Sequence, residues 1–404
     1  MIQAKTVRCL SLLLALILVS TSAFGATHRK KRRPGAEKRA VSSRTVRGKK
    51  GHSRRHTVVT HQSRRRVIPH WNPWKEPTFA DSTSGDFIDG EDLTVRRAAV
   101  DALGPFNGTV VVADPSNGRI LSMVNQKLAL KSGFQPCSTI KVVAALAGLN
   151  EGIVDRNTMV RLYGRTRMTL TDALAHSNNV YFAHIGEQLG FQRVTYYAKL
   201  LGLGETAGFD IPGEQPGTVI SEIPKGGLGM MTSFGEGFSL TPLELASIMA
   251  SIANGGTMYY LQYPRSREEV DKYVPRVKRQ LDLAKWIPEI KPGMSGAVEF
   301  GTARRASYEQ DQPILGKTGT CTDDKSPTHL GWFGSFNDIE KNKLVVVVLL
   351  TGGHGVNGPI AAGVAGQVYR NLSKANYFQQ EHSAAPVAMI STGNCCALRA
   401  SLAR

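Results

Sequence analysis

Acidic residues are scarce in this 404-residue sequence: 32 Asp and Glu stand against 50 Lys and Arg, for a formal net charge of +18. The shortage is local. Residues 29–66 hold sixteen basic residues and one acid, Glu37, so this stretch alone carries +15, and the part from Val67 onward carries +1. A near-neutral body argues against a protein whose main surface binds nucleic acid. We therefore expect no specific nucleic acid as a partner.

Long hydrophobic runs are also missing, which excludes a polytopic membrane protein. The exception is the apolar stretch 9–19, which follows a short basic start and precedes the small-residue pattern Ala23-Phe24-Gly25. This order is typical of a secretory signal peptide. An uncleaved N-terminal anchor is the alternative for residues 1–25. Either way we expect the body to be exported and periplasmic or otherwise extracytoplasmic, attached to the inner membrane if the segment is retained.

Residues 26–70 lack the apolar side chains that a core needs and are dense in Arg, Lys, Ser and His. We predict a disordered basic tail there, followed by a linker over 71–96. A plain solvated spacer is one interpretation of the tail. The other is non-specific attraction of residues 29–66 to anionic membrane or wall polymers.

Cysteines are few, and their spacing is unlike that of a metal site. Cys9 lies in the first apolar stretch, and Cys137, Cys321, Cys395 and Cys396 show no paired spacing with each other or with histidines. The cysteines therefore give no sign of a metal site.

The body shows no internal repeat, and its periodicity predicts strands, then helices, then strands. The runs 108–113 and 118–124 flank the turn residues 114–118 and predict a hairpin. Helices are predicted over 138–150, 170–190, 242–254 and 358–371, and strands over 314–322, 329–337 and 344–351.

The fold class that follows is α+β, an α/β sandwich. Short connections between the last strands indicate an antiparallel sheet, and the run LVVVVLLT indicates burial on both of its faces. We expect a five-stranded antiparallel sheet covered by helices, with an all-helical lobe inserted, in one domain over residues 97–375. Residues 376–404 are predicted to be a poorly ordered C-terminal tail.

Three short motifs carry residue types suited to acyl transfer. In the first, Ser138 and Lys141 are three residues apart on a predicted helix and so share one face. A buried lysine with a lowered pKa can remove the proton of a serine hydroxyl. Alone, this pair also fits a helix cap beside a surface lysine.

The second motif is Ser177-Asn178-Asn179, between two helical stretches, and the third is Lys317-Thr318-Gly319-Thr320 on a predicted strand. A hydroxyl and a carboxamide in the second can relay a proton and hold an amide. A lysine and two hydroxyls in the third suit a substrate carboxylate, and glycine in a strand marks a close approach. Taken singly, each motif also fits an ordinary polar turn or an edge strand.

Together, in this order and on these elements, the three motifs resemble the S-x-x-K, S-x-N and K-T-G set of the penicillin-recognising serine acyltransferases. The flanks resemble the transpeptidase domain of class B penicillin-binding proteins over residues 104–372. The flanking segments that carry this resemblance are 203–214, 235–246, 253–256, 301–303 and 331–333.

The resemblance implies a role for each motif residue. Ser138 would be the acylated nucleophile, Lys141 its general base, Ser177 a proton shuttle, and Asn179 a positioning group for Lys141 and the substrate amide. The substrate carboxylate would be held by Lys317, Thr318, Gly319 and Thr320, and the backbone N–H groups of Ser138 and Thr320 would form the oxyanion hole.

The implied reaction is D,D-transpeptidation of peptidoglycan stem peptides that end in D-Ala-D-Ala, with covalent binding of β-lactams. By the same resemblance it needs no metal and no organic cofactor. A glycosyltransferase is a possible partner by the same resemblance. Two departures from the family are visible: little sequence precedes the hairpin where class B proteins carry a pedestal domain, and the spacing from Ser138 to Ser177 is short.

Competing functions stay open at this stage. A serine β-lactamase would need to hydrolyse its acyl-enzyme. The class A signature E-x-x-L-N is absent, and Asn179 stands at the position where a class D enzyme would have an apolar residue. A D,D-carboxypeptidase would use water as acceptor. A broken motif would favour a non-enzymatic β-lactam sensor or wall-binding scaffold, but all three motifs are intact.

Cys137 and Cys321 flank the first and third motifs, so the fold would bring them near each other. We expect two buried free thiols, with a disulfide as the alternative.

Overall fold

The computed structural model describes residues 74–306, 312–323, 327–353 and 355–380. All of them belong to one of the two compact units of the chain, Pro69–Arg404. The predicted signal or anchor segment and the basic tail lie outside the described residues. No helix within the described ranges is long and apolar enough to cross a membrane.

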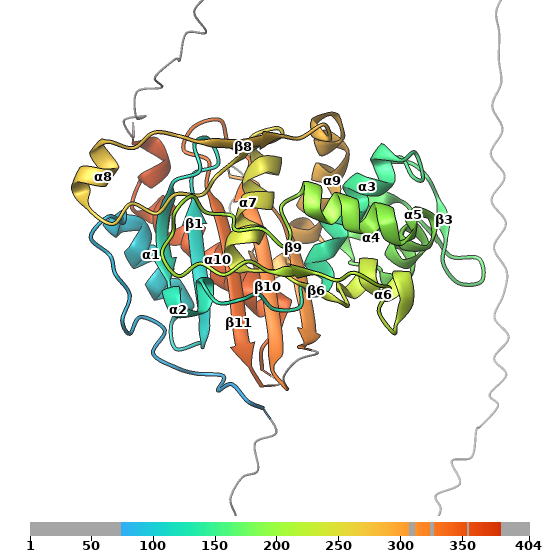
Figure 1. Cartoon of the computed structure of the whole chain (residues 1–404), viewed down its shortest axis with the longest axis horizontal. Helices are drawn as coiled ribbons and strands as arrows, with labels where there is room; N and C mark the ends of the chain where they lie inside the picture. The colour runs from blue at the N-terminus through green and yellow to red at the C-terminus, as the bar shows by residue number, and fades with distance from the viewer. Residues whose placement is uncertain (1–73, 307–311, 324–326, 354, 381–404) are drawn as a thin grey trace, which may run out of the picture. The chain divides into compact units, whose positions relative to one another are not determined.

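A five-stranded antiparallel sheet forms the centre of the fold (Figure 1), as the sequence predicts. Its strand order is β2-β1-β11-β10-β9, so the hairpin and the last three strands join along β1 and β11. The sheet strands are β1 (Gly108–Ala113), β2 (Ile120–Val124), β9 (Ile314–Thr322), β10 (His329–Asn337) and β11 (Val345–Gly352).

The two central strands are buried on both faces, which explains their continuous apolar sequence. Val111 and Val347 belong to a core cluster shared with the helical lobe and α7 (Pro242–Ala253). Val110 and Val348 belong to a second cluster, shared with α1 (Leu93–Leu103) and α10 (Gly358–Lys374). Successive side chains of a strand point to opposite faces, so these two clusters are the two sides of one sheet.

A largely helical lobe is inserted between β2 and β9 (Figure 1); the prediction of an all-helical lobe was too simple, because the same stretch also holds three short two-stranded sheets. Within it α3 and α6 pack against α5, and α4 packs against α9. The lobe helices are α3 (Lys141–Asn150), α4 (Leu170–Ala175), α5 (Asn179–Leu200), α6 (Gly227–Phe234) and α9 (Ile287–Glu299).

Shorter elements complete the described fold. Two more helices are α2 (Gln126–Ala129) and α8 (Arg267–Asp271), and the 3-10 turns are η1 (Cys137–Ile140), η2 (Ala284–Trp286), η3 (Arg304–Ala306) and η4 (Tyr377–Gln379). Three small antiparallel pairs are β3 (Val160–Arg161) with β4 (Arg167–Met168), β5 (Thr218–Val219) with β6 (Phe238–Ser239), and β7 (Thr257–Tyr259) with β8 (Val277–Gln280).

Helix α7 has the start that its sequence predicts. Thr241 is the N-cap and Pro242 the first helical residue, and Glu244 closes a capping box with Thr241. Glu244 does more than cap the helix, because its carboxylate also accepts hydrogen bonds from the backbone N–H groups of Gly204 and Gly217, both at 2.9 Å. One buried side chain thus holds two loops of the domain against the start of α7.

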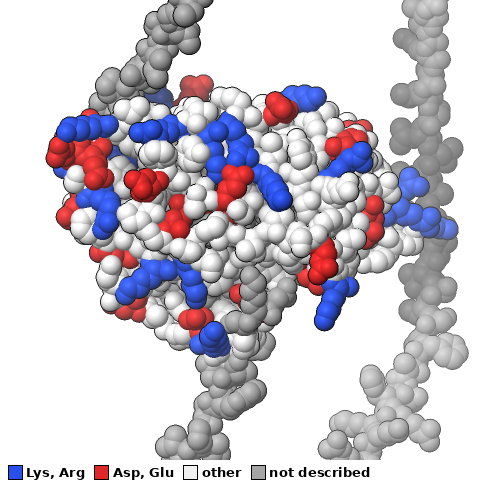
Figure 2. Space-filling model, viewed as in Figure 1, with Lys and Arg blue, Asp and Glu red and all other residues white. Residues whose placement is uncertain are grey.

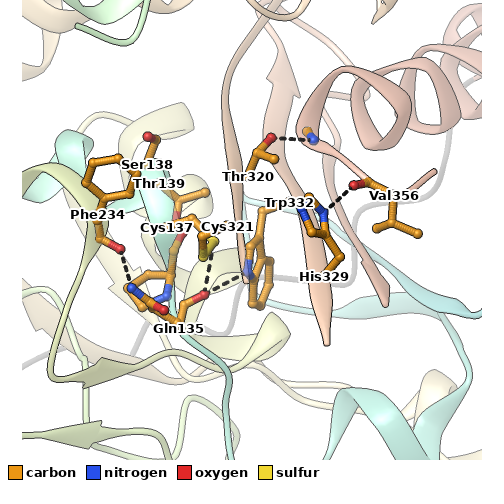
Figure 3. The surroundings of a disulfide bond; sticks show 12 residues. Gln135, Cys137, Ser138, Thr139, Phe234, Thr320, Cys321, His329, Trp332 and Val356 are labelled. Carbon is orange, nitrogen blue, oxygen red and sulfur yellow. Dashed lines mark hydrogen bonds between the residues drawn. A yellow bond between two sulfur atoms is a disulfide. The ribbon is translucent and has the colours of Figure 1, made fainter. Parts of the chain in front are cut away.

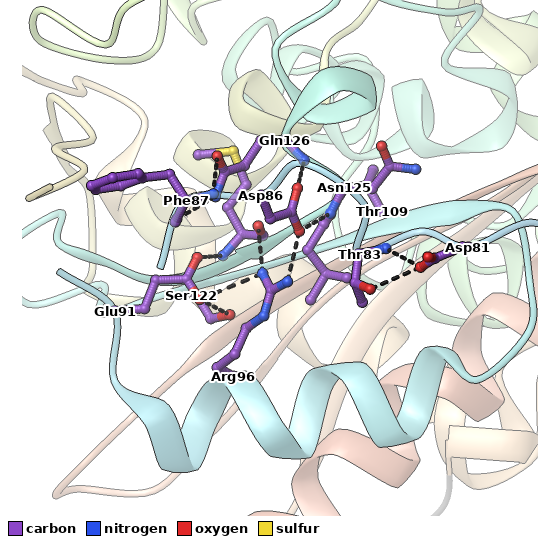
Figure 4. Close-up of polar contacts among 12 residues, drawn as sticks. Asp81, Thr83, Asp86, Phe87, Glu91, Arg96, Thr109, Ser122, Asn125 and Gln126 are labelled. Atoms are coloured by element: carbon purple, nitrogen blue, oxygen red, sulfur yellow. Dashed lines mark hydrogen bonds and ion pairs between the residues drawn. The ribbon is translucent and has the colours of Figure 1, made fainter. Parts of the chain in front are cut away.

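A buried ionic group ties the segment before α1 to the sheet (Figure 4). Arg96 donates to Asp86 Oδ2 at 2.7 Å and to the carbonyl of Met123 at 3.0 Å. Glu91 accepts from the Met123 N–H at 2.8 Å and from the Ser122 hydroxyl at 2.9 Å. These bonds fix the segment before α1 on β2. Because that segment has no regular secondary structure of its own, the periodicity of the sequence gave no signal for them.

The packed region is wider than the predicted range of 97–375. Helix α1 begins inside the predicted linker 71–96, and η4 lies inside the predicted poorly ordered tail 376–404. Tyr377 of η4 is buried and donates to Asp92 Oδ2 at 3.1 Å. This bond joins η4 to the start of α1. The rest of that tail, from residue 381, lies outside the described residues.

Charges of both signs are mixed on the face of the body shown in Figure 2. This agrees with the near-neutral charge of the sequence after residue 66.

Candidate active site

The Ser138 turn lies where the helical lobe meets the edge of the sheet. A helix was predicted over 138–150, but Ser138 sits in the 3-10 turn η1, and the α-helix begins only at Lys141. Cys137, just before Ser138, has φ +52°, a left-handed conformation that no helix interior allows, so the chain enters the turn from a non-helical residue. Ser138 is half-buried, and its hydroxyl lies 3.5 Å from the carbonyl oxygen of Ser233 on α6.

Lys141 is fully buried and its amine joins the first two motifs. Its Nζ lies 3.0 Å from Ser138 Oγ and 3.0 Å from Ser177 Oγ. The same nitrogen donates to the backbone carbonyl of Ser177 at 2.8 Å and to Asn179 Oδ1 at 2.5 Å. The predicted grouping of Ser138, Lys141, Ser177 and Asn179 is therefore present in space.

Burial lowers the pKa of Lys141 to about 6, with a smaller contribution from the charge of Lys317. A neutral amine has two hydrogens and one lone pair. The Ser177 carbonyl and Asn179 Oδ1 can only accept, so they take the two hydrogens and leave the lone pair for a hydroxyl. The geometry suits removal of a proton from Ser138.

Ser177 lies in the turn between α4 and α5, and Asn179 is the first residue of α5. Ser177 has φ +55°, and Asn178 caps α5 by accepting from the backbone N–H of Tyr181 at 2.9 Å. The cap fixes the start of the helix, and the left-handed residue before it turns both Ser177 oxygens toward Lys141.

The third motif lies on β9, the edge strand of the sheet. Lys317 is fully buried, and burial lowers the pKa of its amine to about 7. Its Nζ donates to the carbonyl of Thr318 at 3.2 Å. Gly319 lies against η1: a Cβ at this position would be 3.0 Å from the Pro136 carbonyl oxygen and 3.2 Å from Thr139 Cγ2. Glycine thus lets the strand lie close to the turn.

Two hydroxyls of this strand are held by neighbours. Thr318 Oγ1 lies 2.6 Å from Thr302 Oγ1, which follows α9. Thr320 Oγ1 accepts from the backbone N–H of Gly358, the first residue of α10, at 2.8 Å. Thr320 still has its hydroxyl hydrogen to donate to a ligand.

A disulfide joins Cys137 and Cys321 (Figure 3). The expectation of two free thiols was wrong. The edge strand approaches the turn so closely that the two Cα atoms are 5.6 Å apart, a separation that suits a disulfide. Sequence alone could place both cysteines beside their motifs, but it could not give this distance.

Four further residues near the site had no functional signal of their own. Thr302 belongs to a segment that only contributed to the family resemblance, and Ser233 contributes a backbone oxygen, which no motif reveals. Gln135 and Trp332 brace the Ser138 turn: Trp332 Nε1 donates to the Gln135 carbonyl at 3.0 Å, and Gln135 Nε2 donates to the Phe234 carbonyl at 3.2 Å.

Comparison with known proteins identifies the family of this domain. The family model described as "Penicillin binding protein transpeptidase domain" matches residues 108–373. Stage V sporulation protein D of Bacillus subtilis is 27% identical over 316 residues, which cover 66% of this chain and 49% of that protein. Peptidoglycan D,D-transpeptidase MrdA of Acinetobacter baumannii is 25% identical over 288 residues, which cover 58% of this chain and 42% of that protein.

A solved structure shares the fold. The D,D-transpeptidase domain of a peptidoglycan glycosyltransferase from Eggerthella lenta has a TM-score of 0.58 at 19% identity, covering 70% of this chain and 82% of that one. The chain spans about half or less of the length of the two curated relatives. The family match runs from β1 almost to the end of α10 and includes all three motifs, and the chain therefore belongs to the penicillin-binding protein transpeptidase domain family.

Proposed function

We propose that this protein is a peptidoglycan D,D-transpeptidase that forms an acyl-enzyme on Ser138. The observation that carries the proposal is the buried Lys141 amine, 3.0 Å from Ser138 Oγ and with its pKa lowered to about 6. At neutral pH this amine is uncharged and can take the proton of the hydroxyl. Family membership supplies the substrate class, a stem peptide ending in D-Ala-D-Ala.

The reaction proceeds in two halves. Ser138 Oγ attacks the carbonyl between the two D-Ala residues, and its proton passes to Lys141 Nζ. The tetrahedral intermediate collapses, the terminal D-Ala departs with a proton relayed by the Ser177 hydroxyl, and an ester remains on Ser138. An amine of a neighbouring stem then attacks the ester and gives its proton to Lys141, which restores the serine. Asn179 holds Lys141 and the substrate amide throughout.

The β9 strand binds the substrate on the other side of the site. Lys317 and the hydroxyls of Thr318 and Thr320 take the terminal carboxylate, and Gly319 allows the close approach. A carboxylate beside Lys317 favours its charged form and raises its pKa from about 7. The backbone N–H groups of Ser138 and Thr320 stabilise the oxyanion.

The proposal includes an extracytoplasmic location, exported through the segment 1–25. The disulfide supports it, because such bonds persist in oxidising compartments. The basic residues 29–66 attract anionic membrane or wall polymers, and a glycosyltransferase supplies the glycan strands that carry the stems.

Time-resolved labelling with a fluorescent penicillin tests the nucleophile. We expect a stable covalent label on the wild type and none on Ser138→Ala, with circular dichroism showing both folded. A label that is lost within seconds as the drug is hydrolysed would indicate a β-lactamase. Absence of label from the folded wild type would indicate a sensor or scaffold instead.

Transpeptidation is then separated from carboxypeptidation by the acceptor. A stem pentapeptide ending in D-Ala-D-Ala is incubated with and without a stem peptide bearing a free amine, and products are identified by mass. We expect a cross-linked dimer in the presence of the amine. Release of D-Ala with only the shortened stem as product would assign the protein to the D,D-carboxypeptidases.

A further inference from the structure

The Cys137–Cys321 disulfide joins the two segments that carry the proposed oxyanion-hole amides. The amide nitrogen of Ser138 is bonded directly to the carbonyl carbon of Cys137. Thr320 immediately precedes Cys321 on β9. Figure 3 shows the disulfide lying between the turn that bears Ser138 and the strand that bears Thr320. A covalent path of eleven bonds through the disulfide therefore connects the two amide nitrogens.

These two segments belong to different parts of the fold. The Ser138 turn packs on the helical lobe, where Gln135 is bonded to the Phe234 carbonyl at the end of α6. Strand β9 is paired only with β10, through register pairs that end at Thr322 and His329, so its other edge faces the turn. Within the described residues, a hydrogen bond also links the sheet to the Ser138 turn near Cys137. It runs from Trp332, on β10, to the Gln135 carbonyl. It acts three residues before Ser138 and does not reach Thr320.

We propose that the Cys137–Cys321 disulfide is a positioning element for acylation, which fixes the separation of the Ser138 and Thr320 amides and can be switched by a thiol reductant. The inference rests on the proposed function. It assigns Cys137 and Cys321 a role through their neighbours and not as catalytic residues, since neither touches the reacting atoms.

The conformation of Cys137 supports this role. It is a non-glycine residue with φ +52°, a region that L-residues avoid. Once the cross-link is broken, the turn is free to relax toward an ordinary backbone conformation, and the Ser138 N–H would then change direction. An oxyanion hole depends on donors held to within about 0.5 Å of their productive position beside the developing charge, so a small movement weakens it.

The switch has a chemical route. Cys321 is partly exposed, whereas Cys137 is fully buried. A thiolate of an external dithiol attacks Cys321 Sγ, the bond to Cys137 breaks, and the Cys137 thiolate takes a proton. The second thiol of the reagent then displaces Cys321 as a thiol. Two electrons and two protons pass to the protein, and the dithiol becomes a disulfide.

The experiment measures acylation of the full chain by a fluorescent penicillin, before and after treatment with dithiothreitol. Stopped-flow traces separate the dissociation constant of the non-covalent complex from the acylation rate constant. The matched control is the double variant Cys137→Ser/Cys321→Ser, which has no bond to reduce. Near-ultraviolet circular dichroism at the assay temperature reports whether each sample is folded.

We expect reduction to lower the acylation rate constant of the wild type about tenfold or more, with little change in the dissociation constant. The double variant should be as slow as the reduced wild type and unresponsive to dithiothreitol, and reoxidation should restore the wild type. Equal acylation rate constants in the oxidised and reduced wild type, both folded, would overturn the inference. A rise in the dissociation constant alone, with an unchanged acylation rate constant, would do the same, since weaker binding is not an oxyanion effect.

Two outcomes need separating. If the oxidised wild type takes no label at all, the proposed function has failed. If it is labelled equally in both redox states, only the positioning role has failed. Should the reduced chain unfold, the variant Cys137→Ala/Cys321→Val, which refills the space with apolar groups, replaces it in the same assay. In that variant a wild-type acylation rate constant would overturn the inference.

Discussion

The lysine amine at the centre of the site shows how strongly a few contacts define a residue's chemistry. Lys141 is buried, yet each oxygen around it belongs to a hydroxyl, a carbonyl or a carboxamide, and no carboxylate is among its hydrogen-bond partners. Neutral partners satisfy a neutral amine without stabilising its charge. Burial can therefore keep the pKa low while the position of the nitrogen stays fixed.

The acylation rate should follow the protonation of Lys141. Its pKa is lowered from 10.5 to about 6, so the amine is the free base above pH 6 and gains a proton below it. We expect the second-order rate constant for penicillin acylation to fall about tenfold per pH unit on the acidic side of pH 6. Rates measured between pH 4.5 and 8, with circular dichroism as a check on folding, test this. A rate constant that stays level down to pH 5 would contradict Lys141 as the base.

Thr302 should act on substrate binding through Thr318. The two hydroxyl oxygens are 2.6 Å apart, so Thr302 orients a group that we expect to hold the substrate carboxylate. Replacing Thr302 by valine keeps the shape and removes the bond, for a loss of about 1 kcal/mol, or about fivefold in the dissociation constant. The variant Thr302→Ser should bind like the wild type. The same stopped-flow analysis would count against the prediction if the acylation rate constant fell and binding did not change.

At the level of elements, the prediction succeeded where local chemistry decides the structure. Local sequence is enough to predict the conformation of several segments. These are the capped start of α7 with its proline, the 114–118 turn, and the apolar strands β1 and β11. Prediction failed where tertiary contacts decide. Helix α1 has its start fixed by Asp92 and its position by the Arg96 network, and the Ser138 turn is set by a left-handed cysteine rather than by helix propensity.

Glu244 should be the most sensitive residue of α7. Its two carboxylate oxygens accept from the backbone N–H groups of Thr241, Gly204 and Gly217 at 2.7 to 2.9 Å, all in a buried place. Glu244→Ala leaves these donors without an acceptor, and we expect a loss of about 3 kcal/mol or more in the free energy of unfolding. Glu244→Gln keeps one acceptor oxygen and should lose less. Urea unfolding decides, and equal losses in the two variants would argue against the hydrogen-bond explanation.

On the scale of the whole molecule, the motif residues are up to 182 positions apart in sequence, yet Ser138, Ser177 and Thr320 come from a 3-10 turn, the turn before α5 and an edge strand around one point. The order of the motifs predicted that these residues lie close together, because the resemblance covers the whole domain. The separations themselves come from packing of the lobe on the sheet. This is why the residues of the site could be named from the sequence and the disulfide could not be decided.

Function at this site costs stability. Lys317 is fully buried and its pKa is lowered from 10.5 to about 7, so the unfolded chain binds a proton more readily than the folded one between pH 7 and 10.5. The cost is therefore full below pH 7 and shrinks as the pH rises toward 10.5. We expect Lys317→Met to lose penicillin labelling but to unfold at a higher temperature, by about 3 °C or more at pH 7.

The pH dependence and a surface control test this explanation. The gain in unfolding temperature for Lys317→Met should shrink between pH 7 and pH 9.5. The exposed Lys374 offers the control, because Lys374→Met should leave the unfolding temperature unchanged at both pH values. A Lys317→Met protein less stable than the wild type at pH 7 would show that the lysine stabilises the fold.

The disulfide also gives the chain the topology of a ring. It spans 184 positions of sequence and encloses the entire helical lobe, from α3 to α9. By loop-closure entropy a ring of this size restricts the unfolded chain by about 5 kcal/mol. A protease that cuts once inside the lobe opens the ring without releasing a fragment: the two pieces migrate together until a reductant parts them. The lobe can therefore be nicked, or unfold for a time, while its two ends stay joined beside Ser138.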